Sequence, residues 1–269
     1  MKFNPVRYAR GLIHSCKSRA ARRKLLGSDS AGLIDGDNFA LSLENPTAYY
    51  EAAFVDFHRT VPQAVRDHRR YFSQMGRGFG EDAFHVMWWR LFCRFKPQSF
   101  LEIGVYRGQV ISLLALLAKL EDAPCPVTGI SPFSPVGDSV SKYRSDLNYF
   151  QDTLENFRHF GLAEPVLLQA YSTDPSAVAL IRSRNWDMIY IDGNHDYEIV
   201  SKDWRICAES IKPGGLIVLD DSGLGTSYTP PLFASGGHPG PSRIAAEIDH
   251  ARFDEILQVG HNRVFQRKN

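Results

Sequence analysis

From residue 99 onward the sequence alternates short apolar runs with longer segments of helical periodicity. Five of the apolar runs are predicted as β-strands, at 99–105, 126–131, 165–169, 186–191 and 215–219. The segments between them are predicted as helices near 108–120, 143–160, 174–184 and 196–210. Such alternation indicates an α/β fold, in which a parallel sheet carries helices on both faces. The final stretch, FDEILQVGHNRVFQRK, has two short strands around Gly260-His261-Asn262, so we expect an antiparallel hairpin to end the sheet.

The first 80 residues have weaker helical patterns and precede a helix that is apolar around much of its circumference. Helices are expected around Thr47–Ala53 and Val61–Tyr71, followed by a glycine-rich linker, GRGFG, and the helix EDAFHVMWWRLFCRF. His85 on that helix is interpreted as a core residue. We therefore divide the chain into an N-terminal basic arm with a helical extension, 1–80, and a main domain, 81–269. At 43% hydrophobic residues, 269 residues are enough to bury a full core.

Charge is unevenly distributed although the whole chain has a formal net charge of only +1. Residues 1–28 hold eight basic and no acidic side chains, so the remaining 241 residues carry a formal net charge of −7. Ala9, Leu12, Ile13, Cys16 and Ala20 recur at helical spacing and would form a narrow apolar stripe among the basic residues. We interpret this segment as a solvated terminal helix. Two alternatives are a helix that contacts an anionic membrane peripherally and an organelle transit peptide. The acidic main domain disfavours nucleic acid as a partner.

The four cysteines lie far apart and form no CxxC pair, which argues against a zinc ribbon or a disulfide scaffold. The sequence has no apolar run of about 18 residues, the length that a membrane-spanning helix needs, and no apparent cleavable signal segment. We expect a cytoplasmic protein that is at most peripherally attached to a membrane. Composition leaves open whether the N-terminal 80 residues complete an acceptor pocket or make a homo-oligomer.

A glycine turn follows the first predicted strand, in FLEIGVYRGQ. Ligands of open parallel sheets bind at the carboxyl ends of the strands, where Gly104 and Gly108 would let the backbone approach closely. Their G-x-x-x-G spacing differs from the G-x-G-x-x-G of dinucleotide binders and from the phosphate loop, whose lysine is also missing. The spacing therefore disfavours a nicotinamide dehydrogenase.

This turn, the strand WDMIYIDG and the segment IKPGGLIVLDD, in that order, resemble a class I S-adenosylmethionine-dependent methyltransferase. More narrowly, IDGNHDYEIVSKDW resembles methyltransferase family 24, which includes metal-dependent sugar O-methyltransferases. The resemblance covers roughly residues 81–269. It implies a Rossmann-like, mostly parallel seven-stranded sheet with a C-terminal antiparallel hairpin, and S-adenosylmethionine as cofactor.

The resemblance also implies which residues hold that cofactor. The methionine end would fall to Glu102, Gly104, Tyr106, Gly108 and Gln109. This fits the chemistry, since an aminocarboxylate needs backbone N–H donors and a carboxylate for its ammonium group. Ser131 stands where the family places an acid for the ribose hydroxyls, which is a departure. Ser172 is expected to border the adenine, with Phe133 and Tyr171 as stacking faces, and Asp192 would complete the cofactor site.

Three aspartates end neighbouring predicted strands. Asp192 follows the fourth strand, and Asp220 and Asp221 follow the fifth, so their carboxylates should converge and repel one another unless protons or a cation neutralise them. Oxygen ligands of this kind suit Mg²⁺ or another divalent cation. We therefore predict a metal site formed by these three aspartates.

Beside them, His195 is predicted as the general base, because a histidine can take a proton at neutral pH and Asn194 cannot. A structural histidine is the alternative reading. Asp196 is expected to cap the following helix. The Gly-, Pro- and Ser-rich segment 222–243 would form a lid, with Tyr228 and His238 as candidate contacts, before a helix that Arg243 opens.

These features predict an O-methyltransferase that acts on a hydroxyl of a glycan or other small polyol with the help of a divalent metal. Two alternatives stay open at this point. One is a metal-independent small-molecule methyltransferase, and the other is a methyltransferase-fold protein that binds a ligand without turnover, which the serine at position 131 supports.

Overall fold

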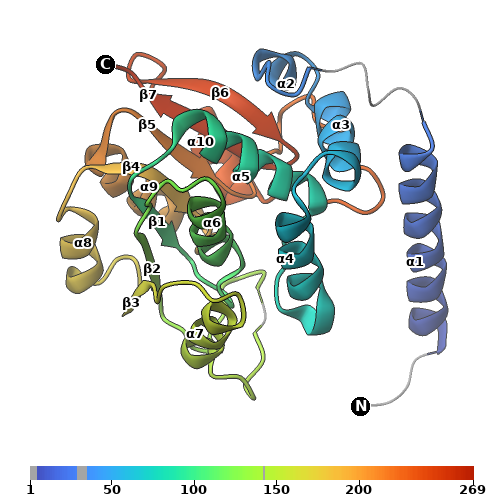
Figure 1. Cartoon of the computed structure of the whole chain (residues 1–269), viewed down its shortest axis with the longest axis horizontal. Helices are drawn as coiled ribbons and strands as arrows, with labels where there is room; N and C mark the ends of the chain where they lie inside the picture. The colour runs from blue at the N-terminus through green and yellow to red at the C-terminus, as the bar shows by residue number, and fades with distance from the viewer. Residues whose placement is uncertain (1–4, 29–34, 142) are drawn as a thin grey trace.

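The computed structural model describes residues 5–28, 35–141 and 143–269, with side chains from Ser15 onward. Its centre is a seven-stranded sheet with the strand order β3-β2-β1-β4-β5-β7-β6 (Figure 1). The strands are β1 (Phe100–Ile103), β2 (Val127–Ser131), β3 (Val166–Gln169), β4 (Trp186–Ile191), β5 (Ile211–Leu219), β6 (Phe253–Val259) and β7 (Asn262–Arg267). The predicted α/β class is confirmed.

The first five strands pair in parallel, and β7 runs antiparallel between β5 and β6. The predicted closing hairpin is therefore confirmed. Strand β5 begins earlier than predicted, because Ile211 already pairs with Trp186 before a register shift leads into the regular ladder. In that ladder Ile191 lies opposite Leu219, which brings the carboxyl ends of β4 and β5 to the same level.

Helices cover both faces of the sheet. The helices are α1 (Pro5–Leu26), α2 (Ala40–Glu44), α3 (Pro46–Arg59), α4 (Gln63–Ser73), α5 (Asp82–Phe95), α6 (Gln109–Leu120), α7 (Tyr149–His159), α8 (Pro175–Ile181), α9 (Tyr197–Ser210) and α10 (Pro239–Ala246), with a 3-10 turn at Gln74–Gly76. Alternate residues of a strand face opposite sides. Thus Met188 and Tyr190 pack with α3, α5 and α6, whereas Ile189 and Ile191 pack with α8, α9 and α10.

The N-terminal helices share the core of the main domain. Tyr50 and Phe54 of α3 are buried in the same cluster as Trp88 of α5, and α3 makes its closest packing with α5. The backbone N–H of Gln258 in β6 donates to the Ser42 hydroxyl at 2.9 Å, which ties α2 to the outer strand of the sheet. The division at residue 80 stays a prediction, but the extension is packed against the sheet rather than held apart from it.

Helix α1 lies at the periphery, next to α3 (Figure 1). The Ser18 hydroxyl donates to the Leu232 carbonyl at 3.2 Å, and the Arg22 guanidinium lies 4.9 Å from the Phe233 ring centroid. Cys16 and Ala20 are exposed, so the stripe predicted from them is not the face that packs, and the side chains of the earlier stripe residues lie outside the described ones. Within the part of the chain that the structure describes, we find no helix that could span a membrane.

Candidate active site

Two adjoining cavities open at the carboxyl ends of the parallel strands. The smaller, of about 290 Å³, lies beside the ends of β1 and β2, and the larger, of about 440 Å³, extends from the turn after β1 to the ends of β4 and β5. Both linings include Gly104, Tyr106, Tyr143 and Gly193. Because these residues form a common border, two ligands that fill the cavities would meet there.

Gly104 holds the turn after β1 against the end of β4. Its φ is +101°, and a Cβ at this position would lie 1.9 Å from the carbonyl oxygen of Asp192. The Gly104 N–H donates to the Ile130 carbonyl at 2.9 Å, and the Asp192 N–H donates to the Ile103 carbonyl at 2.8 Å. A side chain at position 104 would break this close approach, so the glycine is required by geometry.

Glu102 of β1 lines the larger cavity and is buried. Among the described residues its Oε2 atom has no hydrogen-bond partner, and burial, with a smaller contribution from Asp220, raises the pKa of its carboxyl to about 8. Nearby, the Gln109 Oε1 atom accepts a hydrogen bond from the Gly80 N–H at 3.1 Å. A buried carboxyl oxygen without a partner is the kind of acceptor that an ammonium group would satisfy.

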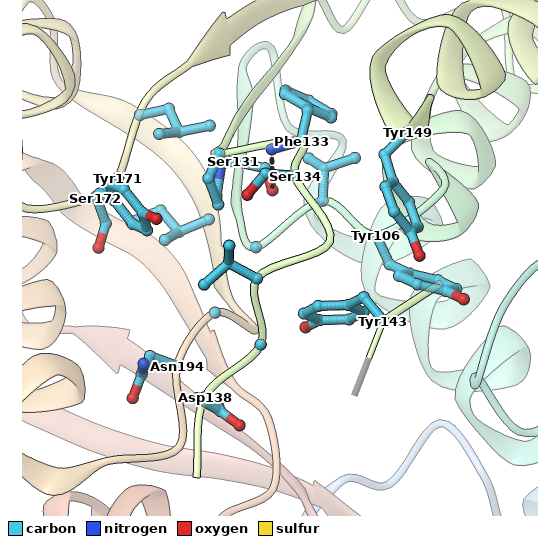
Figure 2. A pocket seen from close by; sticks show the side chains of 18 of the residues that line it. Tyr106, Ser131, Phe133, Ser134, Asp138, Tyr143, Tyr149, Tyr171, Ser172 and Asn194 are labelled. Atoms are coloured by element: carbon cyan, nitrogen blue, oxygen red, sulfur yellow. Dashed lines mark hydrogen bonds between the residues drawn. The ribbon is translucent and has the colours of Figure 1, made fainter. Parts of the chain in front are cut away.

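Several residues predicted to bind the cofactor line the smaller cavity: Gly104, Tyr106, Ser131, Phe133 and Ser172. Figure 2 shows Tyr106, Tyr143 and Tyr149 together on one side, opposite Tyr171 and Ser172. The ring centroid of Tyr106 lies 5.5 Å from that of Tyr143 and 5.2 Å from that of Tyr149. The cavity thus has an aromatic wall and a polar opposite side.

A serine pair occupies the position at which an acid was expected. Ser131 ends β2, and its hydroxyl accepts a hydrogen bond from the Phe133 N–H at 3.5 Å. The Ser134 hydroxyl, adjacent to it in Figure 2, is buried and has no hydrogen-bond partner within the described chain. Together the two hydroxyls offer the donors and acceptors that a ribose needs, although neither carries charge.

Gly108 lies outside the linings of both cavities. It has a φ of +80°, and a Cβ there would lie 2.8 Å from Cγ2 of Thr153 in α7. This glycine therefore allows α6 to begin close to α7. The contact of Gly108 with a cofactor stays a prediction. The close packing of α6 against α7 is enough to explain why a glycine stands at this position.

The three predicted metal ligands do converge, on the lining of the larger cavity. Asp192 and Asp220 share a hydrogen bond, and burial together with the charge of Asp220 raises the pKa of Asp192 well above its ordinary value. Burial alone would raise the pKa of Asp220 too, but the positive charge of His261 and the hydrogen bonds of the site hold it well below its usual range. These opposite shifts of pKa favour a proton on Asp192 rather than on Asp220.

His261 comes from the turn between β6 and β7 and faces both aspartates of β5. Its Nδ1 donates to the Ser235 carbonyl at 3.1 Å, and its Nε2 lies 3.4 Å from Oδ1 of Asp220 and 3.7 Å from Oδ1 of Asp221. Burial would lower the pKa of His261, but Asp220, followed by Asp221, raises it to about 10. The side chain is therefore a buried cation at neutral pH.

His195 lies between two carboxylates. Its Nδ1 is 2.6 Å from Oδ2 of Asp138, and its Nε2 is 2.7 Å from Oδ2 of Asp221. Burial would lower the pKa of His195, but the hydrogen bonds with Asp221 and Asp138 raise it to about 9. In this arrangement His195 already holds a proton at neutral pH, so its predicted role as a base requires that one of these hydrogen bonds be released.

The chain therefore supplies its own positive charges to this cluster. Converging aspartates need protons or a cation, and the raised pKa values of Asp192, His195 and His261 favour a proton on each of these three groups. The cluster is thus compatible with a bound ion without requiring one. A metal ion would have to displace these protons, because protons and metal ions compete for the same ligand atoms.

Three further sequence interpretations need correction. Helix α10 begins at Pro239, so Arg243 lies within this helix and does not open it. Asp196 occupies the N-cap of α9, but its side chain makes no capping hydrogen bond and instead accepts one from the Ser139 hydroxyl at 2.5 Å. The GRGFG segment is more than a linker, because Gly78, Phe79 and Gly80 line the larger cavity. His238 of the predicted lid lines that cavity as well, whereas Tyr228 is packed near Tyr50 with a ring separation of 5.6 Å.

Sequence reasoning missed three residues of this site: Asp138, His261 and Glu81. Asp138 lies in the long loop after β2 and accepts hydrogen bonds from the Val140, Ser141 and His195 N–H groups. Glu81 accepts from the Tyr50 hydroxyl at 2.5 Å and the Ser235 N–H at 3.2 Å. Two features of the sequence could have pointed to these residues: His261 lies in a predicted hairpin turn, and Glu81 directly follows a glycine-rich segment.

Comparison with known proteins identifies the domain around these cavities. Residues 101–222 match methyltransferase family 24, described as a methyltransferase domain. This segment is therefore similar to a methyltransferase domain. The matched segment contains every cofactor-binding, catalytic and metal-binding residue that the sequence predicted. Glu81, His238 and His261 lie outside it, so they belong to parts of this chain beyond the family match.

Solved structures share the fold of this chain. SAH-bound PaMTH1 of Podospora anserina is 17% identical, with a TM-score of 0.55, over 78% of this chain and 89% of that one. A putative caffeoyl-CoA O-methyltransferase of Staphylococcus aureus is 15% identical, with a TM-score of 0.57, over 80% and 97% of the two chains. An O-methyltransferase of Bacillus cereus in complex with SAH is 12% identical, with a TM-score of 0.54, over 84% and 100%.

A curated relative, the uncharacterized protein R132 of Acanthamoeba polyphaga mimivirus, is 22% identical over 157 residues. The match covers 58% of this chain and 62% of that protein, so the chain spans about three fifths of the length of this relative.

Proposed function

We propose that the protein is an O-methyltransferase that transfers the methyl group of S-adenosylmethionine to a hydroxyl of a glycan or other small polyol. The observation that carries the proposal is the common border of the two cavities at Gly104, Tyr106, Tyr143 and Gly193. The nucleoside part of a methyl donor would fill the smaller cavity, and its methionine end would cross this border toward Glu102. An acceptor in the rest of the larger cavity would meet the donor at the border. The SAH-bound methyltransferase of Podospora anserina supports the choice of donor, and the SAH-bound O-methyltransferase of Bacillus cereus supports the choice of donor and of reaction.

The residues present fit S-adenosylmethionine. The unpartnered Oε2 of Glu102 offers an acceptor to the ammonium group, and Gly104 leaves room for the backbone to approach the ligand. Ser131 and Ser134 would hold the ribose, while Phe133 and Ser172 line the far part of the cavity. When bound, this cofactor supplies an electrophilic methyl group on a sulfonium.

The larger cavity fits a polyhydroxy acceptor. Carboxyl and imidazole groups of Glu81, Asp192, His195, His238 and His261 line it, and each can donate or accept a hydrogen bond with a hydroxyl. The aromatic rings of Phe84, Trp88 and Tyr190 also contribute to the lining and offer apolar surface to the C–H face of a sugar ring. Dense polar groups beside aromatic faces favour a sugar over a purely apolar acceptor.

Asp192, Asp220 and Asp221 would hold Mg²⁺ or another divalent cation. When bound, such an ion supplies positive charge that lowers the pKa of an acceptor hydroxyl. His195 is the proposed base, and Asp138 fixes its ring so that Nε2 points at Asp221 and the cavity. The proton shared by His195 and Asp221 must leave Nε2 before that atom can accept one from the hydroxyl.

Two measurements test the proposal. Calorimetry should detect binding of S-adenosylmethionine to the purified chain, and incubation with a panel of sugars, nucleotide sugars and catechols should yield S-adenosylhomocysteine. Absence of both binding and product would favour a binding protein without turnover. Activity that survives EDTA would favour a metal-independent enzyme. That result would refute the metal site but not the proposed methyl transfer.

We also propose peripheral contact of α1 with an anionic membrane. Four basic side chains of its described part are exposed: Lys17, Arg19, Arg23 and Lys24. Removing residues 1–28 should abolish sedimentation with phosphatidylserine vesicles at low salt, and unchanged sedimentation would refute this contact.

A further inference from the structure

Asp221 lies among imidazoles rather than only among carboxylates. Its Oδ2 atom is 2.7 Å from Nε2 of His195 and 3.9 Å from Nε2 of His238. One ligand atom from each of these three side chains lies within 4.8 Å of the other two, which is close enough for all three to bind one ion. The two rings are 4.5 Å apart at their centroids, with an interplanar angle of 62°.

A carboxylate backs His195 in the way that carboxylates back metal-binding histidines. Oδ2 of Asp138 lies 2.6 Å from Nδ1 of His195 and also accepts the His195 N–H at 2.8 Å. A hydrogen bond at Nδ1 fixes the tautomer and leaves Nε2 available as a ligand. The orientation of the His195 ring is therefore determined by a residue outside the cluster.

His238 is brought to Asp221 by its own backbone. The His238 N–H donates to the Asp221 carbonyl at 2.7 Å, and a Cβ on Gly237 would lie 2.4 Å from the same oxygen. The glycine therefore lets the chain approach Asp221 closely enough for the His238 side chain to reach it. This segment lies outside the part of the chain that matches the methyltransferase family.

We propose that His195, His238 and Asp221 form a two-histidine, one-carboxylate centre for a divalent transition-metal ion. Imidazole ligands favour Fe²⁺, Co²⁺, Ni²⁺ or Zn²⁺, whereas Mg²⁺ prefers oxygen. The centre shares Asp221 with the all-oxygen site but takes two imidazoles in place of Asp192 and Asp220. It is therefore an alternative to that site, and while it is occupied Nε2 of His195 does not act as a base. It opens onto the larger cavity, since all three of its residues line that cavity. Only the use of this ion in catalysis rests on the proposed function; its binding does not.

The test is a titration of the full chain, stripped of metal by a chelator, with Co²⁺. Paramagnetic Co²⁺ shifts the ring N–H protons of bound histidines far outside the normal proton NMR range, so two such exchangeable signals are expected at one equivalent. His238→Ala should remove one signal and weaken Co²⁺ binding at least about tenfold. Asp138→Asn, which leaves the ligands in place, should weaken it about 10–100-fold. His250→Ala, at an exposed histidine in the turn before β6, is the matched control and should change neither.

Failure of this inference is distinguishable from failure of the proposed function. Stoichiometric Co²⁺ without shifted N–H signals, equal affinity in His238→Ala and wild type, or no Co²⁺ binding would each overturn the histidine centre. Methyl transfer from S-adenosylmethionine could still be observed in any of those cases. Because about a third of the His238 side chain is exposed, its replacement leaves the fold in place, which a thermal melt of the variant checks.

Discussion

Replacing Gly104 with alanine should damage both stability and cofactor binding. The added Cβ would lie 1.9 Å from the Asp192 carbonyl oxygen and 2.5 Å from the Gly193 Cα, whereas real Cβ contacts essentially never fall below 3.0 Å. The turn after β1 and the end of β4 must therefore separate by about 1 Å. That separation would move Tyr106, which lies on the common border of the cavities, and Asp192, which lines the larger cavity.

The expected loss of folding free energy in Gly104→Ala has two contributions, which a control variant can separate. A positive φ costs a non-glycine residue about 1–2 kcal/mol, and crowding against backbone adds about 1–3 kcal/mol. Gly214 has a φ of +74°, and no described heavy atom lies within 4 Å of a Cβ placed there. Gly214→Ala should therefore cost about 1–2 kcal/mol, and Gly104→Ala about 2–5 kcal/mol.

Urea unfolding of both variants gives the two free energies, and calorimetry with S-adenosylhomocysteine gives the affinity. We expect the affinity to fall in Gly104→Ala and to stay at the wild-type value in Gly214→Ala, because position 214 lies at the opposite end of the sheet. Equal destabilisation of the two variants, or full ligand affinity in Gly104→Ala, would refute the argument from close backbone approach.

Three other predictions concern buried titratable groups. Glu102→Gln should weaken S-adenosylmethionine binding about 10–100-fold in calorimetry, since a charge-assisted hydrogen bond is lost; an unchanged Kd would exclude this residue from the site. Asp138→Asn should lower the pKa of His195 from about 9 and move the corresponding limb of the kcat/KM profile to lower pH by about 1 unit or more; an unmoved limb would show that His195 is not the titrating group. Burial lowers the pKa of His68 well below its usual value and that of His85 to about 3, so the unfolded chain takes up protons that the folded one does not. Stability should therefore fall as the pH drops below about 6.5, and His85→Gln should reduce this slope by about 1.4 kcal/mol per pH unit in urea unfolding; an unaltered slope would contradict a neutral buried pair.

The convergence of three aspartates could be predicted from the sequence because it follows from topology alone. Strands β4 and β5 are parallel neighbours, so residues directly after them reach the same edge of the sheet. The sequence therefore predicts that Asp192, Asp220 and Asp221 lie at one edge of the sheet, and the structure has them there. The glycine turn at Gly104 was predictable for the same reason, since it follows the first strand of an open sheet.

The histidines and Asp138 around those aspartates could not be predicted in the same way. His261 reaches Asp220 only because β7 inserts between β5 and β6, and a hairpin pattern does not say on which side its second strand will pair. Asp138 lies in a long irregular loop that has no periodicity to fix its direction. The protonation of Asp192 and His195 depends on these missed neighbours, so the charge state of the site lay beyond sequence reasoning as well.

The position of β7 also has a consequence for synthesis on the ribosome. β7 supplies the antiparallel partner of both β5 and β6, so neither can complete its ladder while the chain is still short of residue 267. Until then the nascent protein would present the free side of β5 as an unpaired edge, the kind that invites aggregation or a chaperone. The same late step delivers His261, so assembly of the charged cluster and completion of the sheet are a single event.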